Sequence, residues 1–370
     1  MTYILLLMLC ILSSCSEYGE NINPQNDHVR TNDCCLKYVE DISFELDSHT
    51  ANIFMASQYN PAENLYSFMS IDKKIVLYDY ESKRLIRKIP LPGLRPSSYE
   101  YINKDTILVL DYANNELTMI DCNANILSSY KINHKIEYYP FPATKTSPIT
   151  CIDSCVYIWG NIAGEYSNEN DYNRRVLLKY TPHKKETAYF VPYPQIYKEN
   201  WNGTMFRWCY ADYNPNKDIF VVSFPGDHFL YAYDYRSDKL NKIYGGSEYI
   251  DATKFVLKNK AEFIDADTRT KHFVESHSYS KIMYDSYNDV YYRFAELKTV
   301  YEGIPGWEKN ISIIILNSSH EIIGETYIGA IPSIYRYASF ITENGLHIPK
   351  HRVNDDVLTF SIYQLIDKIK

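Results

Sequence analysis

Tyrosine, arginine and charged side chains suited to binding a polar ligand lie in four short segments of the chain. The segments cover residues 98–102, 207–213, 278–284 and 333–341, and each has the composition of a short strand. Their candidate ligand-binding residues are Tyr99, Glu100, Arg207, Tyr210, Lys281, Tyr335 and Arg336. Arginine offers a planar fork of donors and tyrosine an apolar ring with a hydroxyl, so this set suits a carboxylate, a phosphate or a sugar. The alternative is that these side chains are solvated strand ends.

Two further candidates, Arg293 and Trp208, lie outside or at the edge of these groups. Arg293 interrupts the apolar run at residues 290–294, and a buried arginine requires an anion or several carbonyl acceptors. It is therefore either a brace between sheets or an anchor for a ligand. Trp208 ends a loop rich in aromatics that begins at residue 193. Exposed aromatic rings beside Asn and Arg suit sugar stacking, and core packing explains them equally well.

Signals for metal binding and for nucleophilic catalysis are poor. His347 and His351 are separated by Pro349, which argues against a helix, and in a strand they would lie about 13 Å apart. The chain contains no His-Glu-x-x-His, Gly-x-Ser-x-Gly, phosphate-loop or dinucleotide motif. No catalysis and no bound cofactor are expected, although a calcium ion held by oxygen ligands from separate sheets stays open as an alternative.

The N-terminus has the features of an export signal. Residues 3–12 are a run of about ten apolar residues, too short to cross a bilayer, and small residues follow it. The sequence Leu-Ser-Ser-Cys that ends at Cys15 resembles a bacterial lipobox. We therefore predict a lipoprotein signal peptide at 1–14, lipid attachment at Cys15, and a polar, flexible tether at 15–33. The alternative is an ordinary secretory signal with an incidental cysteine.

The cysteines of the predicted mature domain are expected to be mostly free and buried. They are Cys34, Cys35, Cys122, Cys151, Cys155 and Cys209. An even number in an oxidising compartment permits disulfides, but a chain of this size does not need them in order to fold.

The charge balance and the apolar content indicate a packed domain that does not bind nucleic acid. Lys and Arg number 38 against 46 Asp and Glu, and the formal net charge is -8. Phosphate backbones require clustered basic residues, so the acidic balance argues against nucleic-acid partners. Apolar residues make up 45% of the chain, which is enough to build a core over residues 34–370.

Short β-branched and aromatic runs, separated by polar turns, predict an all-β fold. The runs recur in groups of four, as a comparison of residues 103–132 with 216–244 shows. Six such groups predict a six-bladed β-propeller, with seven blades if the insertion at 245–276 holds strands. The last group lacks its fourth strand, while residues 36–46 precede the first group. We therefore predict that an N-terminal strand completes the C-terminal blade and closes the ring.

A lipobox, a polar tether and six tyrosine-rich blades together resemble the six-bladed β-propeller lipoproteins of unknown function from Bacteroidetes-type bacteria. The resemblance covers residues 15–370. It implies an outer-membrane protein, lipid-anchored on the periplasmic or the cell-surface side, and it implies no particular activity.

Three functions are compatible with these features. We rank first a non-enzymatic propeller that binds a glycan, a peptide or an envelope protein at the mouth of its channel. A scaffold or assembly propeller is second. A metal-dependent hydrolase or lyase that acts on carbohydrate or an ester in the channel is third.

Overall fold

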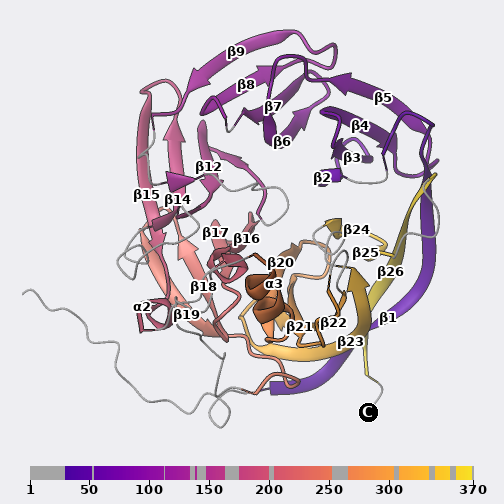
Figure 1. Cartoon of the computed structure of the whole chain (residues 1–370), viewed down its shortest axis with the longest axis vertical. Coiled ribbons are helices and arrows are strands. Elements are labelled where there is room, and N and C mark those ends of the chain that lie inside the picture. Colours follow the sequence, from indigo (N-terminus) through magenta and orange to yellow (C-terminus); the bar gives the residue numbers. More distant parts are fainter. Residues whose placement is uncertain are drawn as a thin grey trace, which may run out of the picture.

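The computed structural model describes residues 30–51, 54–111, 113–133, 138–139, 147–162, 175–199, 204–251, 266–303, 308–332, 338–350 and 356–368. The fold is all-β, and its sheets follow one another in chain order around a common centre, in a propeller-like arrangement (Figure 1). The predicted signal peptide and Cys15 lie outside the described residues.

Four separate four-stranded antiparallel sheets make up the first part of this arrangement. The first sheet contains β2 (Phe54–Asn60), β3 (Leu65–Ser70), β4 (Lys74–Asp79) and β5 (Leu85–Pro90). The second contains β6 (Pro96–Asn103), β7 (Thr106–Asp111), β8 (Glu116–Ile120) and β9 (Ile126–Lys131). The third contains β11 (Thr150–Ile152), β12 (Cys155–Trp159), β14 (Arg175–Thr181) and β15 (Glu186–Pro192). The fourth contains β16 (Tyr210–Asn214), β17 (Ile219–Ser223), β18 (Phe229–Asp234) and β19 (Lys239–Tyr244).

The rest of the ring is one eight-stranded sheet. Its strands, in spatial order, are β20 (Ser278–Asp285), β21 (Val290–Leu297), β22 (Glu308–Asn317), β23 (Ile322–Pro332), β1 (Arg30–Glu45), β26 (Val357–Asp367), β25 (Gly345–Pro349) and β24 (Phe340–Thr342). The remaining described elements are the strand pair β10 (Tyr138–Tyr139) and β13 (Asn161–Ile162), the helices α2 (Gln195–Glu199) and α3 (Ala266–Val274), and the 3-10 helix η2 (Thr204–Arg207).

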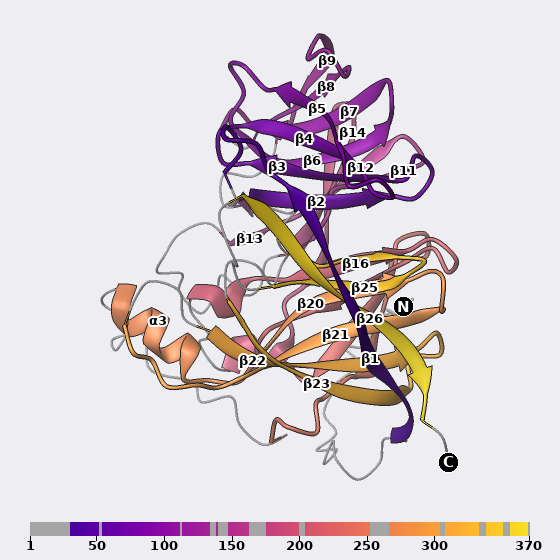
Figure 2. The same cartoon turned by 90° about the vertical axis from the view of Figure 1, so that its right-hand side faces the viewer.

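Strand β1 joins the two ends of the chain. It pairs antiparallel with β26, from Cys34 opposite Asp367 to Glu45 opposite Val357. This pairing confirms the predicted contact between the N-terminal strand and the last strand (Figure 2). The strand begins at Arg30, so the segment predicted as a tether, 15–33, ends earlier than expected.

The single eight-stranded sheet differs from the two separate sheets that the sequence predicted. The reason is the length of β1, which has 16 residues and pairs in parallel with β23 as well, at Cys34 opposite Gly324. A Cβ atom at Gly324 would lie 2.3 Å from the carbonyl oxygen of Cys34. Glycine therefore permits the close approach of the two backbones.

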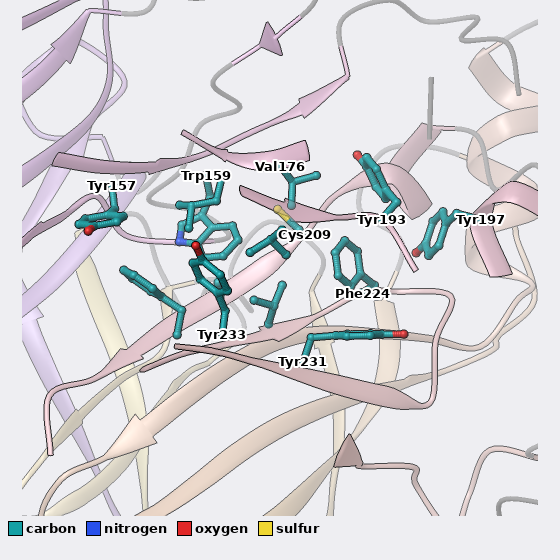
Figure 3. Packing of buried hydrophobic residues seen from close by; sticks show 14 of the residues in the cluster. Tyr157, Trp159, Val176, Tyr193, Tyr197, Cys209, Phe224, Tyr231 and Tyr233 are labelled. Atoms are coloured by element: carbon teal, nitrogen blue, oxygen red, sulfur yellow. The ribbon is translucent and has the colours of Figure 1, made fainter. Parts of the chain in front are cut away.

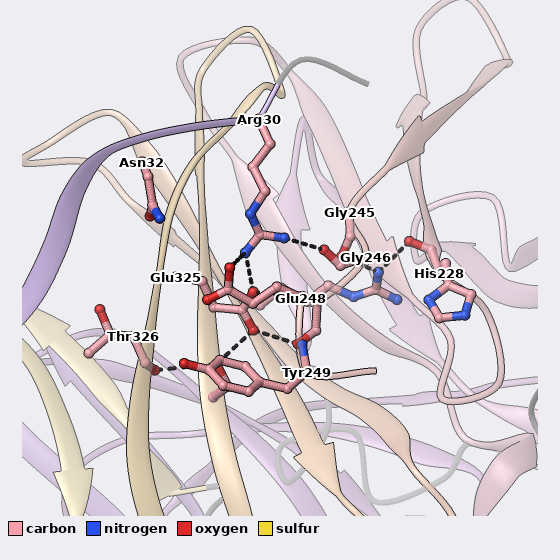
Figure 4. A network of polar contacts seen from close by, with 12 residues as sticks. Arg30, Asn32, His228, Gly245, Gly246, Glu248, Tyr249, Glu325 and Thr326 are labelled. Atoms are coloured by element: carbon pink, nitrogen blue, oxygen red, sulfur yellow. Dashed lines mark hydrogen bonds and ion pairs between the residues drawn. The ribbon is translucent and has the colours of Figure 1, made fainter. Parts of the chain in front are cut away.

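A buried polar network holds the start of β1 (Figure 4). Arg30 forms an ion pair with the buried carboxylate of Glu325 on β23. Ser247 and Ser312 donate hydrogen bonds to Glu325 Oε1 at 2.5 and 2.6 Å, and the backbone N–H of Glu248 donates to Oε2 at 2.9 Å. The carboxylate thus ties β1 to β22, to β23 and to the loop after β19.

Buried aromatic and aliphatic side chains fill the space between neighbouring sheets. Figure 3 shows the cluster between the third and fourth sheets, where Tyr157 and Trp159 of β12 face Tyr233 of β18. Tyrosine suits these positions because its ring adds apolar area while its hydroxyl reaches a partner at the edge of the core. The hydroxyl of Tyr197, for example, donates to the carbonyl oxygen of Phe206 at 2.8 Å.

Many tyrosines also fix hairpin turns. In four hairpins, a tyrosine hydroxyl donates to the side chain of an Asp or Asn five residues later. The pairs are Tyr59 with Asn64 (3.2 Å), Tyr213 with Asp218 (2.6 Å), Tyr233 with Asp238 (2.9 Å) and Tyr284 with Asp289 (2.7 Å). Each acceptor residue has a φ between 52° and 56°, a conformation that Asn and Asp tolerate better than other non-glycine residues.

The insertion at 245–276 contributes helix α3 to the described part of the structure, and the described residues of this range contain no strand. These residues therefore do not supply the strands that a seventh blade would require. Buried Lys309 on β22 fixes the end of the helix, because its Nζ donates to the carbonyl oxygens of Phe273 at 3.0 Å and Ser276 at 2.7 Å.

The six cysteines in the described ranges are all free. Three of them, Cys34, Cys155 and Cys209, are buried. Among the described residues, no helix has the length and apolar character needed to cross a membrane.

Candidate functional site

A cavity of about 570 Å³ lies where the innermost strands of the sheets converge. Every part of the ring contributes to its wall: β2, β6, β16, β20, β24, and the third sheet through β11 and the segment before it. The polar lining side chains relevant to ligand binding are Gln58, Glu100, Cys151, Asp212, Lys281 and Ser339. The strands β2, β6, β11 and β16 are edge strands of their sheets, so backbone polar groups also face this centre.

Gln58 and Glu100 form one side of the cavity. The amide nitrogen of Gln58 donates to the carbonyl oxygen of Tyr99 at 2.5 Å and to Glu100 Oε2 at 3.2 Å. The backbone N–H of Tyr101 donates to the amide oxygen of Gln58 at 3.1 Å. Gln58 therefore cross-links the first and second sheets and sets the direction of the Glu100 carboxyl group.

The pKa of Glu100 is raised to about 8. Burial is the largest cause, since it removes water that would stabilise the carboxylate, and repulsion from Asp212 adds to the shift, while the Gln58 hydrogen bond opposes it. At neutral pH the group is mainly protonated in this site, so it can donate one hydrogen bond and accept another.

Asp212 and Lys281 form the opposite side. Asp212 accepts hydrogen bonds from the backbone N–H of Tyr284 at 2.8 Å and of Tyr213 at 3.0 Å, which fixes it between the fourth sheet and β20. Burial raises the pKa of Asp212 to about 6 despite these bonds. Lys281 donates to the carbonyl oxygen of Ser339 at 2.5 Å, and burial lowers its pKa to about 8 while attraction to Asp212 opposes the shift.

Cys151 completes the set of titratable groups. Cys151 is exposed to solvent, yet partial enclosure by the cavity wall raises the pKa of its thiol, and Glu100 adds to the effect. The thiolate is the nucleophilic form, so Cys151 is a poor nucleophile at neutral pH. The cavity as a whole presents a neutral carboxyl, a carboxylate, an ammonium and an amide, a set that forms directional hydrogen bonds with a polar ligand.

The structure corrects two of the predicted ligand-binding residues. Tyr99 and Tyr210 are fully buried between sheets and do not line the cavity. The hydroxyl of Tyr99 is 2.8 Å from Ser67 Oγ, inside the core of the first and second sheets. Side chains of a strand alternate between its two faces, and on these two innermost strands the faces are covered by neighbouring sheets.

Arg293 is also not a ligand anchor, because all of its donors are already used inside the protein. Its Nε donates to Ser223 Oγ at 3.0 Å, and its two terminal nitrogens donate to four carbonyl oxygens. Those carbonyl groups belong to Asp227, His228, Phe229 and Gly245. The guanidinium also stacks on Tyr279, with its carbon 3.7 Å from the ring centre. Arginine has five N–H donors, so Arg293 acts as the brace that was the alternative interpretation.

The other predicted residues have mixed outcomes. Glu100 and Lys281 do line the cavity, whereas Arg207 is largely buried at the end of η2 and Trp208 is half-buried beside the core. Tyr335 and Arg336 lie outside the described residues. Sequence reasoning missed Asp212, although an aspartate inside the tyrosine-rich segment 207–213 was a usable signal.

Metal binding has no support in the described part of the chain. No group of three or more His, Cys, Asp or Glu side chains there has a geometry suited to a metal ion. Buried His347 instead lies in the core, stacked on Phe340 with ring centres 4.4 Å apart.

The family model described as "Domain of unknown function (DUF4221)" matches residues 34–327, which is most of the chain. The chain belongs to the DUF4221 family. A crystal structure of a DUF4221 member from Bacteroides vulgatus superposes on this DUF4221 protein with a TM-score of 0.76 at 23% identity, over 92% of this chain and 100% of the other. A crystal structure of a protein named "Putative exported protein" from Bacteroides fragilis gives a TM-score of 0.52 at 11% identity, over 92% of this chain and 98% of the other. No curated protein matches the sequence. At these identities the two structures support the fold, and the function has to be argued from the site.

Proposed function

We propose that this DUF4221 protein is a lipid-anchored outer-membrane protein that binds a small polar ligand in its central cavity. The observation that carries the proposal is the convergence of Glu100, Asp212 and Lys281, from three different sheets, on one cavity of about 570 Å³. That volume lies within the range of small-molecule sites. The ligand is a glycan, a peptide or an exposed segment of an envelope protein.

The fold behind this proposal is a six-bladed propeller. The four separate sheets are four blades, and the eight-stranded sheet divides into the blades β20–β23 and β24–β26 with β1. Support comes from the contribution of each of these six groups to the wall of the cavity. Completion of the last blade by β1 removes the edges that an open ring would expose.

The proposed location has separate support. The lipobox-like sequence before Cys15 and the short apolar segment at 3–12 favour lipid modification after export. The name of the Bacteroides fragilis neighbour also points to export. Metabolic labelling with a palmitate analogue tests this: the label should appear on the wild-type protein and be lost in Cys15→Ala. Equal labelling of both proteins would contradict the lipid anchor.

A second candidate function has one specific observation in its favour. Glu100, with a pKa of about 8, and Asp212, with a pKa of about 6, differ in protonation at neutral pH. One neutral and one ionised carboxyl group in the same site is the arrangement of a general acid and a general base. The alternative is therefore a hydrolase or lyase that acts on a carbohydrate or an ester in the cavity.

A ligand screen against the mature protein tests the proposal. Oligosaccharide and peptide libraries are added, and the melting temperature is measured for wild type, Glu100→Gln and Lys281→Met. A ligand of the cavity should raise the melting temperature of the wild type, and its affinity should fall at least tenfold in one of the variants. Equal affinity in all three proteins would exclude the cavity, and mass spectrometry of the recovered ligand separates binding from cleavage.

A further inference from the structure

A second pocket, which we call the tyrosine pocket, lies beside the mouth of the central cavity. It is lined by Tyr59, Pro61, Asn64, Tyr80, Glu81, Lys83, Tyr287, Glu343 and Asn344, and its volume is about 570 Å³. These residues come from the turns of the first sheet and from the turns β20–β21 and β24–β25 of the eight-stranded sheet. Tyr59 and Pro61 line both the tyrosine pocket and the central cavity.

We propose that the tyrosine pocket binds a pyranose ring of a glycan. The proposal does not depend on whether the central cavity is occupied, because Lys83, Tyr287 and Glu343 line the tyrosine pocket and not that cavity. Binding of a sugar ring requires an aromatic face for its C–H groups and a ring of donors and acceptors for its hydroxyls.

The aromatic face is supplied by Tyr287, which is 46% exposed in the turn between β20 and β21. Tyr80, which lines the same pocket, is buried, and its hydroxyl lies 2.7 Å from Nε2 of His347. The ring of Tyr59 packs edge-on against Tyr80 at 5.1 Å, and its hydroxyl donates to Asn64. One exposed ring and one packed aromatic pair therefore line the same pocket.

The charges of the pocket argue against an anionic ligand. Its lining has the exposed carboxylates of Glu81 and Glu343 and a single ammonium, that of Lys83. Nζ of Lys83 already donates to the carbonyl oxygen of Tyr80 and lies 4.2 Å from the centre of the Tyr80 ring. The carboxylates accept hydrogen bonds from the hydroxyls of a sugar, and the aromatic rings contact its C–H groups.

The turns that carry these groups are fixed in place. Gly345, next to Asn344, has a φ of +121°, and a Cβ there would lie 2.3 Å from the carbonyl oxygen of Tyr363. The N–H of Asn344 donates to Thr342 Oγ1 at 3.1 Å. Lys83 itself has a φ of +61° in the turn between β4 and β5. Little conformational freedom is lost when a ligand binds such a preformed site.

The test is a glycan array probed with the mature wild-type protein, followed by calorimetry on each glycan that binds. Tyr287→Ala should weaken binding at least tenfold, because it removes the stacking face. Tyr287→Phe should retain most of the affinity. The matched control is Tyr249→Ala, an exposed tyrosine in the loop after β19, which should leave the affinity unchanged.

Three results of these binding measurements would overturn the proposal. Failure of the wild type to bind any glycan on the array would reject it, as would equal binding by wild type and Tyr287→Ala. If Glu100→Gln loses the glycan while Tyr287→Ala keeps it, the sugar occupies the central cavity. That result would refute the role of the tyrosine pocket and support the proposed function. A Tyr287→Trp variant adds a second readout, since a stacked sugar should change its tryptophan fluorescence.

Discussion

The hydroxyl of Tyr80 lies 2.7 Å from Nε2 of His347, although the two residues are 267 positions apart in the chain. Nδ1 of the same imidazole is 3.0 Å from the carbonyl oxygen of Gly345. A carbonyl only accepts, so Nδ1 carries the proton and Nε2 accepts from the tyrosine. This buried contact joins the first sheet to β25, in addition to the backbone pairing of β1 with β26.

Replacement of Tyr80 by phenylalanine should weaken the contact between the first sheet and β25. The substitution leaves Nε2 of buried His347 without its donor, which costs about 1–2 kcal/mol of unfolding free energy. Urea unfolding of the mature protein measures the change. The control, Tyr249→Phe, alters an exposed residue and should shift the value by less than about 0.5 kcal/mol. Equal stability of Tyr80→Phe and wild type would show that the hydrogen bond makes no net contribution.

The contribution of His347 should depend on pH. Burial lowers its pKa to about 4, below the ordinary value of 6.5, so the unfolded chain binds the proton more readily than the folded protein. Stability is therefore lost as the pH falls from 6.5 towards 4. The advantage of wild type over His347→Gln in urea unfolding should shrink by about 1.5 kcal/mol between pH 6.5 and pH 5. A stability difference that is constant over this pH range would mean that buried His347 binds a proton as readily as it does in the unfolded chain.

Glu100→Gln should stabilise the protein at alkaline pH. The folded-state pKa of Glu100, about 8, is above its ordinary value of 4.5, so stability falls as the pH rises from 4.5 through 8. The variant removes this loss while keeping the amide–oxygen contact with Gln58. We expect it to exceed wild type by about 1–2 kcal/mol at pH 9 and to match it at pH 5, since water in the cavity offsets part of the burial. A lower melting temperature at pH 9 would contradict this.

Arg293→Met should cost more than about 3 kcal/mol of unfolding free energy. It removes a buried guanidinium whose hydrogen bonds satisfy carbonyl groups at Asp227, His228 and Gly245. Arg293→Lys should be almost as harmful, because an ammonium has three donors and no planar fork. Arg236→Lys is the control, as Arg236 forms its ion pairs at the surface with 53% of its side chain exposed. A small effect at Arg293 would reopen its role in ligand binding.

Gly324→Ala should loosen the parallel pairing of β1 with β23. The new methyl group would collide with the carbonyl oxygen of Cys34, and relief of that contact costs about 1–3 kcal/mol. Hydrogen exchange followed by mass spectrometry should show faster exchange at residues 30–38 in the variant. Strands β16–β19 serve as the internal control and should exchange at the wild-type rate. Unchanged exchange at 30–38 would mean that the backbone adapts without opening.

The candidate site was only partly accessible to prediction. Glu100 and Lys281 were selected as charged residues in short strand-like segments, and both line the cavity. Tyr99 was selected with Glu100 from the same segment, but neighbouring residues of a strand point in opposite directions and Tyr99 enters the core. Gln58 was missed because its strand was not among the selected segments, and Asp212 was missed because the sequence does not show which side chains of the segment 207–213 face the centre. That depends on how the sheets are arranged around the centre.

Local patterns in the sequence determined the strands, their polar turns and their grouping, since alternation and turn chemistry act over a few residues. They also predicted the contact of the first strand with the last, because each end lacked a partner. Tertiary structure alone decided that β1 joins two groups of strands into one sheet. It also decided that Arg293 donates its hydrogen bonds to carbonyl groups, and which side chains meet at the centre. These outcomes depend on contacts between residues far apart in the chain, and the local periodicity of a strand is the same whichever sheet comes to lie beside it.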